Sequence, residues 1–306
     1  MIDGLSAEVY ALLASLCFAA SQVAVRRGMV RTSVVASVLV TLVAAFGVLL
    51  VFVLLQPPSE IDMWGAALFA AGGLASPGVA RWASNTGTHQ LGPSISGSIT
   101  QGARPLLAVA GGILLLNESL SGTEALGLVL IVAGGWRLTR AREADPSPGT
   151  VGAMGAPTRD ASGRLLRRGL IFPLVAGLAY AIQDVVSKDA LSYLPDARFG
   201  AFVGISTALA GWALVTLALP AVRRQVRFGD DLGWLVASGV LAGLAIVNLF
   251  AALGEGDITV VSPIVATQPL AVFILSRLLL RHLESLTLTT VLAGTGIVVG
   301  TIAVSL

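Results

Sequence analysis

The sequence predicts an all-α integral membrane protein with ten transmembrane helices, arranged as two inverted five-helix repeats. Of its 306 residues, 55% are hydrophobic and only 12% are charged, whereas a soluble protein carries about 25% charged residues. Ten apolar segments approach the roughly 20 residues that a bilayer span requires, and one sequence pattern occurs twice. Because each copy has an odd number of spans, the two copies must point in opposite directions across the membrane.

The first five spans are expected near residues 7–26, 33–55, 63–86, 94–116 and 121–139. All should be helices, because an open sheet would leave backbone polar groups unsatisfied in lipid. The connections between these spans are short. Gln56-Pro57-Pro58-Ser59 has the composition of a turn, and Asn117-Glu118 barely separates the fourth and fifth spans.

Residues 141–168 interrupt the apolar pattern with a flexible, basic linker. They include Asp145-Pro146-Ser147-Pro148-Gly149, a composition typical of mobile connections. The other five spans follow near residues 169–188, 199–220, 232–253, 259–280 and 286–305. We therefore expect a first repeat over residues 1–140, the linker over 141–168 and a second repeat over 169–306.

The duplication is visible near the end of each half. Arg104-Pro105-Leu106 is followed, thirteen residues after its proline, by Glu118-Ser119-Leu120. Gln268-Pro269-Leu270 is followed, fifteen residues after its proline, by Glu284-Ser285-Leu286. Matches also occur near the start of each half, where Gln22 falls opposite Asp184. Ordered matches at both ends favour true duplication over the general likeness of apolar helices.

The positions of the charges predict an orientation, because Lys and Arg concentrate in cytoplasmic loops. If the N-terminus is outside, the inside loops are rich in arginine and the outside loops are mainly acidic. The arginines assigned to the inside loops are Arg26, Arg27, Arg31, those of the linker, Arg223, Arg224 and Arg227. We therefore expect a multi-pass plasma-membrane protein with a cytoplasmic linker and both termini outside.

The doubled motif resembles the EamA type of the drug/metabolite transporter superfamily, in its ten-helix branch. The pattern of that family is a proline in the fourth helix, small residues, a Glu-x-Leu turn and a glycine-rich fifth helix. The matching residues are Pro105, 108–112, 118–120 and 127–135, then Pro269, 284–286 and 294–300. The chain departs from the pattern at 273–277, which are bulky, and in its predicted orientation, since relatives usually place both termini in the cytoplasm. The resemblance implies a secondary transporter.

Arg104 is the strongest candidate for a substrate-binding residue. It lies near the middle of the fourth span, where a charge costs about 2.5–3.5 kcal/mol to insert. Gln101 is three residues earlier, on roughly the same helix face. A guanidinium donates in a planar fork that suits a carboxylate or another anionic group. The alternative is an internal pair with Asp184 or with helix carbonyls.

Asp184 is the candidate coupling residue. It lies four residues after Tyr180 and four before Lys188, so all three share one helix face. A carboxylate in a partly desolvated cavity holds its proton more tightly, which suits proton coupling. The alternative, which we favour slightly, is an ion pair with Lys188 near the membrane surface.

Uncharged polar and aromatic residues complete the candidate substrate site. They are Gln22, Trp82, Asn85, Tyr180, Gln183, Asn248 and Gln268. Each could instead join neighbouring helices, a contact worth about 0.6 kcal/mol. Glu118 and Glu284 are expected as turn residues, and Ser121 to Glu124 is close to a capping box. The sequence places no other metal-ligating residues in a pattern with His89 or His282, so we expect no metal.

We expect a secondary transporter that exports a small organic metabolite by alternating access, with proton coupling as an option. The solute would be amino-acid-like, or otherwise anionic or zwitterionic. The alternative is a lipid or lipid-carrier flippase of the same superfamily. The chain has no Walker, H-E-x-x-H or G-x-S-x-G motif, so we expect no enzyme and no cofactor. Expected partners are the solute and membrane lipid, not nucleic acid, and a homodimer is left open.

Overall fold

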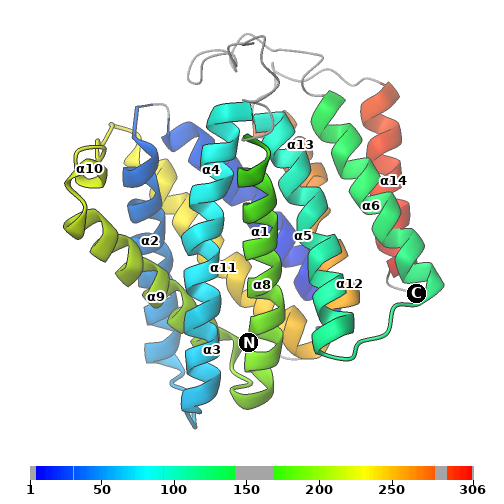
Figure 1. Cartoon of the computed structure of the whole chain (residues 1–306), viewed down its shortest axis with the longest axis horizontal. Coiled ribbons are helices and arrows are strands. Elements are labelled where there is room, and N and C mark those ends of the chain that lie inside the picture. The colour runs from blue at the N-terminus through cyan, green and yellow to red at the C-terminus, as the bar shows by residue number, and fades with distance from the viewer. Residues whose placement is uncertain (1–4, 30, 92, 142–168, 280–287, 305–306) are drawn as a thin grey trace. The chain divides into compact units, whose positions relative to one another are not determined.

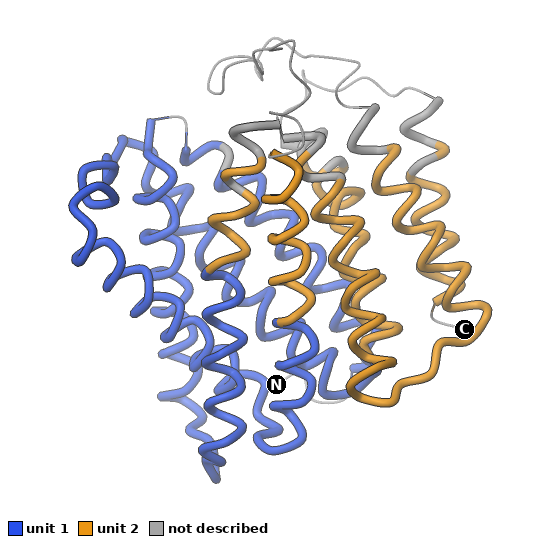
Figure 2. Tube along the Cα trace, in the orientation of Figure 1, with its two compact units in different colours: residues 1–78, 183–257 blue, residues 79–182, 258–306 orange. Residues whose placement is uncertain are grey.

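The structure of the chain is a computed structural model that describes residues 5–29, 31–91, 93–141, 169–279 and 288–304 (Figure 1). Every regular element among these residues is a helix, which confirms the all-α prediction. The helices divide into two compact units (Figure 2), one formed by residues 1–78 and 183–257, the other by 79–182 and 258–306. We call them unit 1 and unit 2. Each unit combines segments from both halves of the sequence.

Unit 1 contains six helices and the second part of a seventh, α8 (Ile171–Tyr193), among the described residues. The six are α1 (Ala7–Gly28), α2 (Val34–Leu55), α3 (Met63–Gly73), α9 (Ala197–Ala218), α10 (Pro220–Arg223) and α11 (Leu232–Glu255). Small residues let these helices approach closely. Ser21 on α1 and Ser238 on α11 join their hydroxyls at 2.9 Å, and a side chain at Gly239 would collide with the backbone of Thr41.

Unit 2 contains the first part of α8 and six further helices among its described residues. They are α4 (Ala80–Leu91), α5 (Pro93–Leu115), α6 (Gly122–Ala141), α12 (Ile258–Val265), α13 (Gln268–Leu279) and α14 (Leu288–Val304). The last helices of the two halves, α6 and α14, pack together through glycines. A Cβ at Gly300 would lie 2.8 Å from the carbonyl oxygen of Gly127, so a larger residue there would separate α14 from α6.

The ten predicted spans all fall on helices, and two of them are interrupted. The third contains η1 (Leu74–Val79), where Ser76 leaves helical geometry with φ −147° and ψ 129°. The ninth breaks between α12 and α13. By length and composition, six stretches are apolar enough to cross a membrane: Ala7–Val25, Val34–Leu55, Met63–Ser84, Ile171–Tyr193, Ala197–Ala218 and Leu232–Glu255. Shorter apolar stretches are Ile99–Leu115, Ile258–Val272 and Gly294–Val304.

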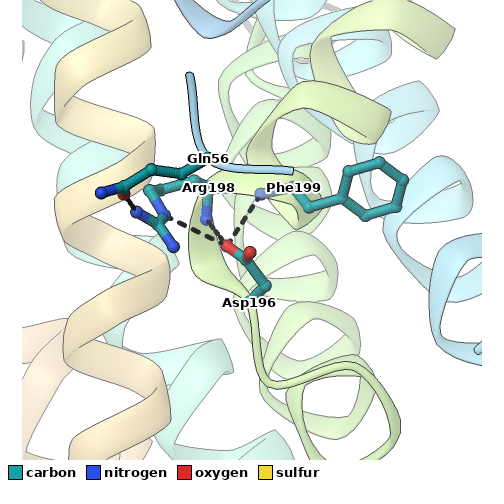
Figure 3. A network of polar contacts seen from close by, with 4 residues as sticks. All are labelled: Gln56, Asp196, Arg198 and Phe199. Atoms are coloured by element: carbon teal, nitrogen blue, oxygen red, sulfur yellow. Dashed lines mark hydrogen bonds and ion pairs between the residues drawn. The ribbon is translucent and has the colours of Figure 1, made fainter. Parts of the chain in front are cut away.

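Asp196 connects the start of α9 to the end of α2 (Figure 3). Its carboxylate accepts hydrogen bonds from the backbone amides of Arg198, at 2.9 Å, and Phe199, at 3.1 Å. The same oxygen lies 3.4 Å from the Arg198 guanidinium, which also donates to the side-chain oxygen of Gln56. Asp196 therefore satisfies backbone donors that every helix N-terminus leaves open.

We predict that Asp196→Ala lowers the free energy of unfolding by about 0.5–2 kcal/mol, the usual effect of losing an N-cap. Thermal unfolding of the detergent-purified protein measures it. Asp189→Ala is the matched control, because Asp189 lies inside the preceding helix, α8, and not at a helix start. Equal unfolding temperatures for the two variants would contradict this role of Asp196.

Candidate functional site

Arg104 lies in the interior of unit 2, near the middle of α5. The residue is 7% exposed, and α5 continues through Pro105 without interruption. Its guanidinium carbon lies 5.3 Å from the centroid of the Tyr180 ring on α8. A guanidinium over the face of an aromatic ring is attracted by the negative charge of that face. Two of the predicted site residues therefore lie together.

The contact between Arg104 and Tyr180 depends on a close approach of α8 to α5. Gly177 lies one turn before Tyr180, and a Cβ there would be 2.7 Å from the Cβ of Ala103 and 3.4 Å from the backbone nitrogen of Arg104. One turn earlier again, the Thr100 hydroxyl donates to the carbonyl of Pro173 at 3.2 Å. The small residue and the hydrogen bond together fix the height at which the ring meets the guanidinium.

Gln101 and Gln268 also lie together. The side-chain nitrogen of Gln101 donates to the side-chain oxygen of Gln268 at 3.4 Å, and Gln268 is only 5% exposed. Gln268 is the first residue of α13, directly after the break that follows α12. Thr267 marks this break, where its hydroxyl donates to the Ile264 carbonyl at 2.7 Å. Broken helices at mid-membrane are a recurring feature of transporter binding sites.

Arg81 is a polar residue of unit 2 that the sequence analysis did not include in the site. It lies on α4 and is partly buried. The available signal was an arginine within the predicted third span, an otherwise apolar segment. Trp82 helps to hold α4 against α8, since its ring meets that of Phe172 edge-on at 5.8 Å. Arg81 and Arg104 both have further interactions in the protein.

The other predicted substrate residues are divided between the two units and differ in exposure. Trp82 is 49% exposed, and the side chain of Asn85 lies outside the described part of α4. Gln22, Gln183 and Asn248 belong to unit 1. Gln22 is exposed and Gln183 is buried, while Asn248 donates to the Leu244 carbonyl of its own helix at 2.8 Å.

Asp184 is 1% exposed and lies one turn after Tyr180 on α8. We expected it close to the end of its span, but α8 continues for nine more residues, to Tyr193, and Asp184 is therefore interior. The favoured ion pair with Lys188 is wrong. The Lys188 ammonium donates instead to the Gly256 carbonyl at 2.8 Å and lies 4.0 Å from Asp257, because the end of α11 supplies a carbonyl within its reach.

Glu118 does more than occupy a turn. Its two carboxylate oxygens accept hydrogen bonds from the backbone amides of Ile258, at 3.0 Å, and Thr259, at 3.1 Å. Asn117 has a positive φ of 57°, which turns the chain so that Glu118 faces the start of α12. A carboxylate at a helix N-terminus satisfies open donors and complements the helix dipole. Glu284 and His282, its nearest histidine, lie outside the described residues.

The predicted capping box at the start of α6 is confirmed. The amide of Ser121 donates to the carboxylate of Glu124 at 2.7 Å, and the amide of Glu124 donates to the Ser121 hydroxyl at 3.2 Å. This reciprocal pair satisfies two donors at the helix start. Among the described residues, no group of three or more His, Cys, Asp or Glu side chains could hold a metal ion.

Comparison with known proteins identifies the family. The sequence model of the EamA-like transporter family matches residues 5–139 and 167–306. The chain belongs to this family. It is accordingly a multi-pass membrane transporter of the drug/metabolite transporter superfamily, and its two matched segments confirm the two-repeat prediction.

Solved structures show the same fold. One of them, described as "Crystal structure of protein", is 18% identical, covers 98% of each chain and superposes with a TM-score of 0.76. At this identity the likeness concerns the fold alone. No curated protein matches the sequence significantly.

We predict that Glu118→Ala destabilises this EamA-family protein by about 1–3 kcal/mol, because two backbone amides at the start of α12 lose their acceptors. Glu118→Gln, which keeps one acceptor, should have an intermediate effect. Thermal unfolding of the purified variants measures both. Glu60→Ala, in an exposed loop, is the control, and an unfolding temperature of Glu118→Ala equal to the control's would refute the capping role.

Proposed function

We propose that this EamA-family protein is a secondary transporter for a small organic solute that carries a carboxylate, either amino-acid-like or otherwise anionic or zwitterionic. The observation that carries the proposal is the buried Arg104, held over Tyr180 in the middle of a membrane helix. Ionisable residues at this depth are functional by default. A guanidinium presents a planar fork of donors to a carboxylate, and Gln101, one turn before Arg104 on α5, bonds to the amide of Gln268.

Alternating access is the proposed mechanism, with the two repeats inverted relative to each other. Each compact unit contains helices from both repeats, and the chain passes between units after residues 78, 182 and 257. The first passage adjoins the interruption at Leu74–Val79, and the last lies between α11 and α12. Movements of compact units about a few residues at the ends of elements are a common form of domain motion.

We further propose export across the plasma membrane, coupled to protons through Asp184. The buried position of that carboxylate in a membrane helix supports coupling, because ionisable residues inside the membrane commonly form proton relays. The distribution of arginines supports a cytoplasmic linker and external termini. Export follows the general role that the superfamily resemblance implies.

Arg104→Gln should reduce solute flux at least about tenfold, because a charge-assisted hydrogen bond contributes about 1.5–3 kcal/mol. The assay is counterflow of labelled amino acids, carboxylates and a short-chain phospholipid into proteoliposomes. Arg137→Gln is the control, since Arg137 is exposed on α6, and it should transport as the wild type does. Flux of the lipid alone would favour a flippase, and equal flux in both variants would remove Arg104 from the site.

Asp184→Asn should abolish accumulation driven by a pH gradient while leaving counterflow of the same solute intact. Counterflow exchanges one solute molecule for another and needs no net proton movement, whereas gradient-driven accumulation does. Flux with and without an imposed pH gradient separates the two. Gradient-driven accumulation that survives in Asp184→Asn would exclude this carboxylate as the coupling group.

A further inference from the structure

Five exposed arginines of unit 1 come together from three segments of the chain. The segments are the end of α1, the connection from α1 to α2, and the stretch that leads from α9 through α10 to α11 (Figure 1). The arginines are Arg27, Arg31, Arg223, Arg224 and Arg227. We call them the arginine cluster.

Polar contacts hold two of these segments side by side. The amide of Ser33 donates to the Arg227 carbonyl at 3.0 Å, and the amide of Arg227 donates to the Ser33 hydroxyl at 3.1 Å. The amide of Gly229 donates to the Thr32 hydroxyl at 3.0 Å. A Cβ at Gly229 would lie 2.7 Å from the Cβ of Arg31, so a larger residue would push the two segments apart. Arg31 and Arg227 therefore belong to one local surface.

The other three arginines are attached to this surface by turns and by packing. Arg223 and Arg224 belong to the α10 region, where the amide of Val226 donates to the Arg223 carbonyl at 3.2 Å. This turn lies directly before the residue that bonds to the first connection. Arg27, at the end of α1, places its guanidinium carbon 5.1 Å from the centroid of the Trp234 ring, at the start of α11.

The acidic residues of these segments only partly offset the arginines. Residues 27–33 and 220–234 contain five arginines and two aspartates, Asp230 and Asp231. Asp230 lies 3.3 Å from the Arg31 guanidinium, but the two side chains are 89% and 72% exposed, and an ion pair this exposed is weak. Asp231 makes no side-chain capping bond at the start of α11.

Three guanidinium groups of the cluster have no protein partner within the part of the chain that the structure describes. They are those of Arg223, Arg224 and Arg227, which form neither an ion pair nor a side-chain hydrogen bond there. Guanidinium groups bind phosphate through paired, charge-assisted hydrogen bonds. The donors of these three side chains are therefore open to a phosphate group.

Exposed apolar side chains flank the same arginines. Leu219, directly before α10, is 50% exposed, and Phe228, next to Arg227, is 60% exposed. Trp234, which contacts Arg27, is 40% exposed, and tryptophan is enriched at the level of the lipid headgroups. Arginines beside exposed apolar residues match a phospholipid, whose phosphate is negative and whose acyl chains are apolar.

We propose that the arginine cluster binds the headgroup of an anionic phospholipid and so anchors this part of unit 1 at the membrane surface. Basic pockets on the cytoplasmic side of membrane helices bind such headgroups, and the cytoplasmic leaflet is negatively charged. The proposed orientation puts both connections that form the cluster on that side. The inference does not depend on the transport proposal, because Arg104 and Tyr180 belong to unit 2.

Equilibrium binding to the full-length detergent-purified protein tests this inference. The probes are a short-chain phosphatidylglycerol, a phosphatidylcholine with the same acyl chains, and glycerol 3-phosphate. The first is an anionic lipid, the second a zwitterionic lipid, and the third a phosphate without acyl chains. Thermal-shift titration gives the affinities. The wild type should bind phosphatidylglycerol at least about tenfold more tightly than the other two, because each arginine near an anionic surface contributes about fivefold.

Substitution of the three arginines without partners locates the site. The combined variant Arg223→Gln, Arg224→Gln and Arg227→Gln should lose most of the preference for phosphatidylglycerol, whereas lysine at the same positions should keep most of it. Arg137→Gln, exposed on α6, is the control and should match the wild type. If the combined glutamine variant unfolds at a lower temperature without lipid, the three single variants replace it, each with an expected loss of about fivefold.

Three results would overturn the inference. They are phosphatidylcholine binding as tightly as phosphatidylglycerol, glycerol 3-phosphate binding as tightly as the anionic lipid, and a preference that survives the glutamine substitutions. The second result would identify a soluble phosphate compound as the ligand instead of a lipid.

Discussion

Inside a membrane, a charged or polar group must find its partners within the protein, because the lipid offers none. Arg104 shows how strongly this requirement shapes unit 2. A guanidinium in the middle of α5 needs an environment that lipid cannot provide, and the ring of Tyr180 on α8 supplies part of it. Gln101 and Gln268 satisfy each other across α5 and α13, and Thr100 bonds to α8. The packing of unit 2 around α5 follows from these needs.

Small residues make this packing around α5 possible. The polar contacts of α5 are short only because the helices around it approach without intervening side chains at Gly177 and Gly87. In lipid there is no hydrophobic driving force between helices, so close van der Waals packing and polar contacts must hold them together. Glycine therefore serves the candidate site indirectly, by setting the distance between the Arg104 guanidinium and the Tyr180 ring. A larger residue at Gly177 would separate α8 from α5 and move the ring away from the guanidinium.

The two halves of the sequence are joined at Glu118. This residue belongs to the Glu-x-Leu turn of the first repeat, but its carboxylate caps α12, which belongs to the second. The division into units also combines the two repeats, since each unit contains helices from both. A motif that looks like a turn signal in the sequence is therefore also a contact between the repeats. Its glutamate is suited to that role because a carboxylate offers two acceptor oxygens to two adjacent amides.

The sequence by itself determined the features that depend on local composition. Apolar length predicted where helices would form, the spacing of Ser121 and Glu124 predicted a capping box, and the doubled motif identified the family. Arg104 was found because a charge in the middle of an apolar segment is conspicuous. These signals are contained within one helix or one repeat, so no knowledge of tertiary contacts is needed to recognise them.

Only the tertiary structure decided which distant residues meet. Lys188 bonds to Gly256 rather than to its helical neighbour Asp184, Glu118 reaches Ile258 across 140 positions, and Arg104 lies over the Tyr180 ring of a helix in the other half of the sequence. The break between α12 and α13 was also absent from the apolar pattern. Hydropathy measures how a segment partitions into lipid, but the partner of a buried polar group depends on which helices pack together, and that is fixed by contacts remote in sequence.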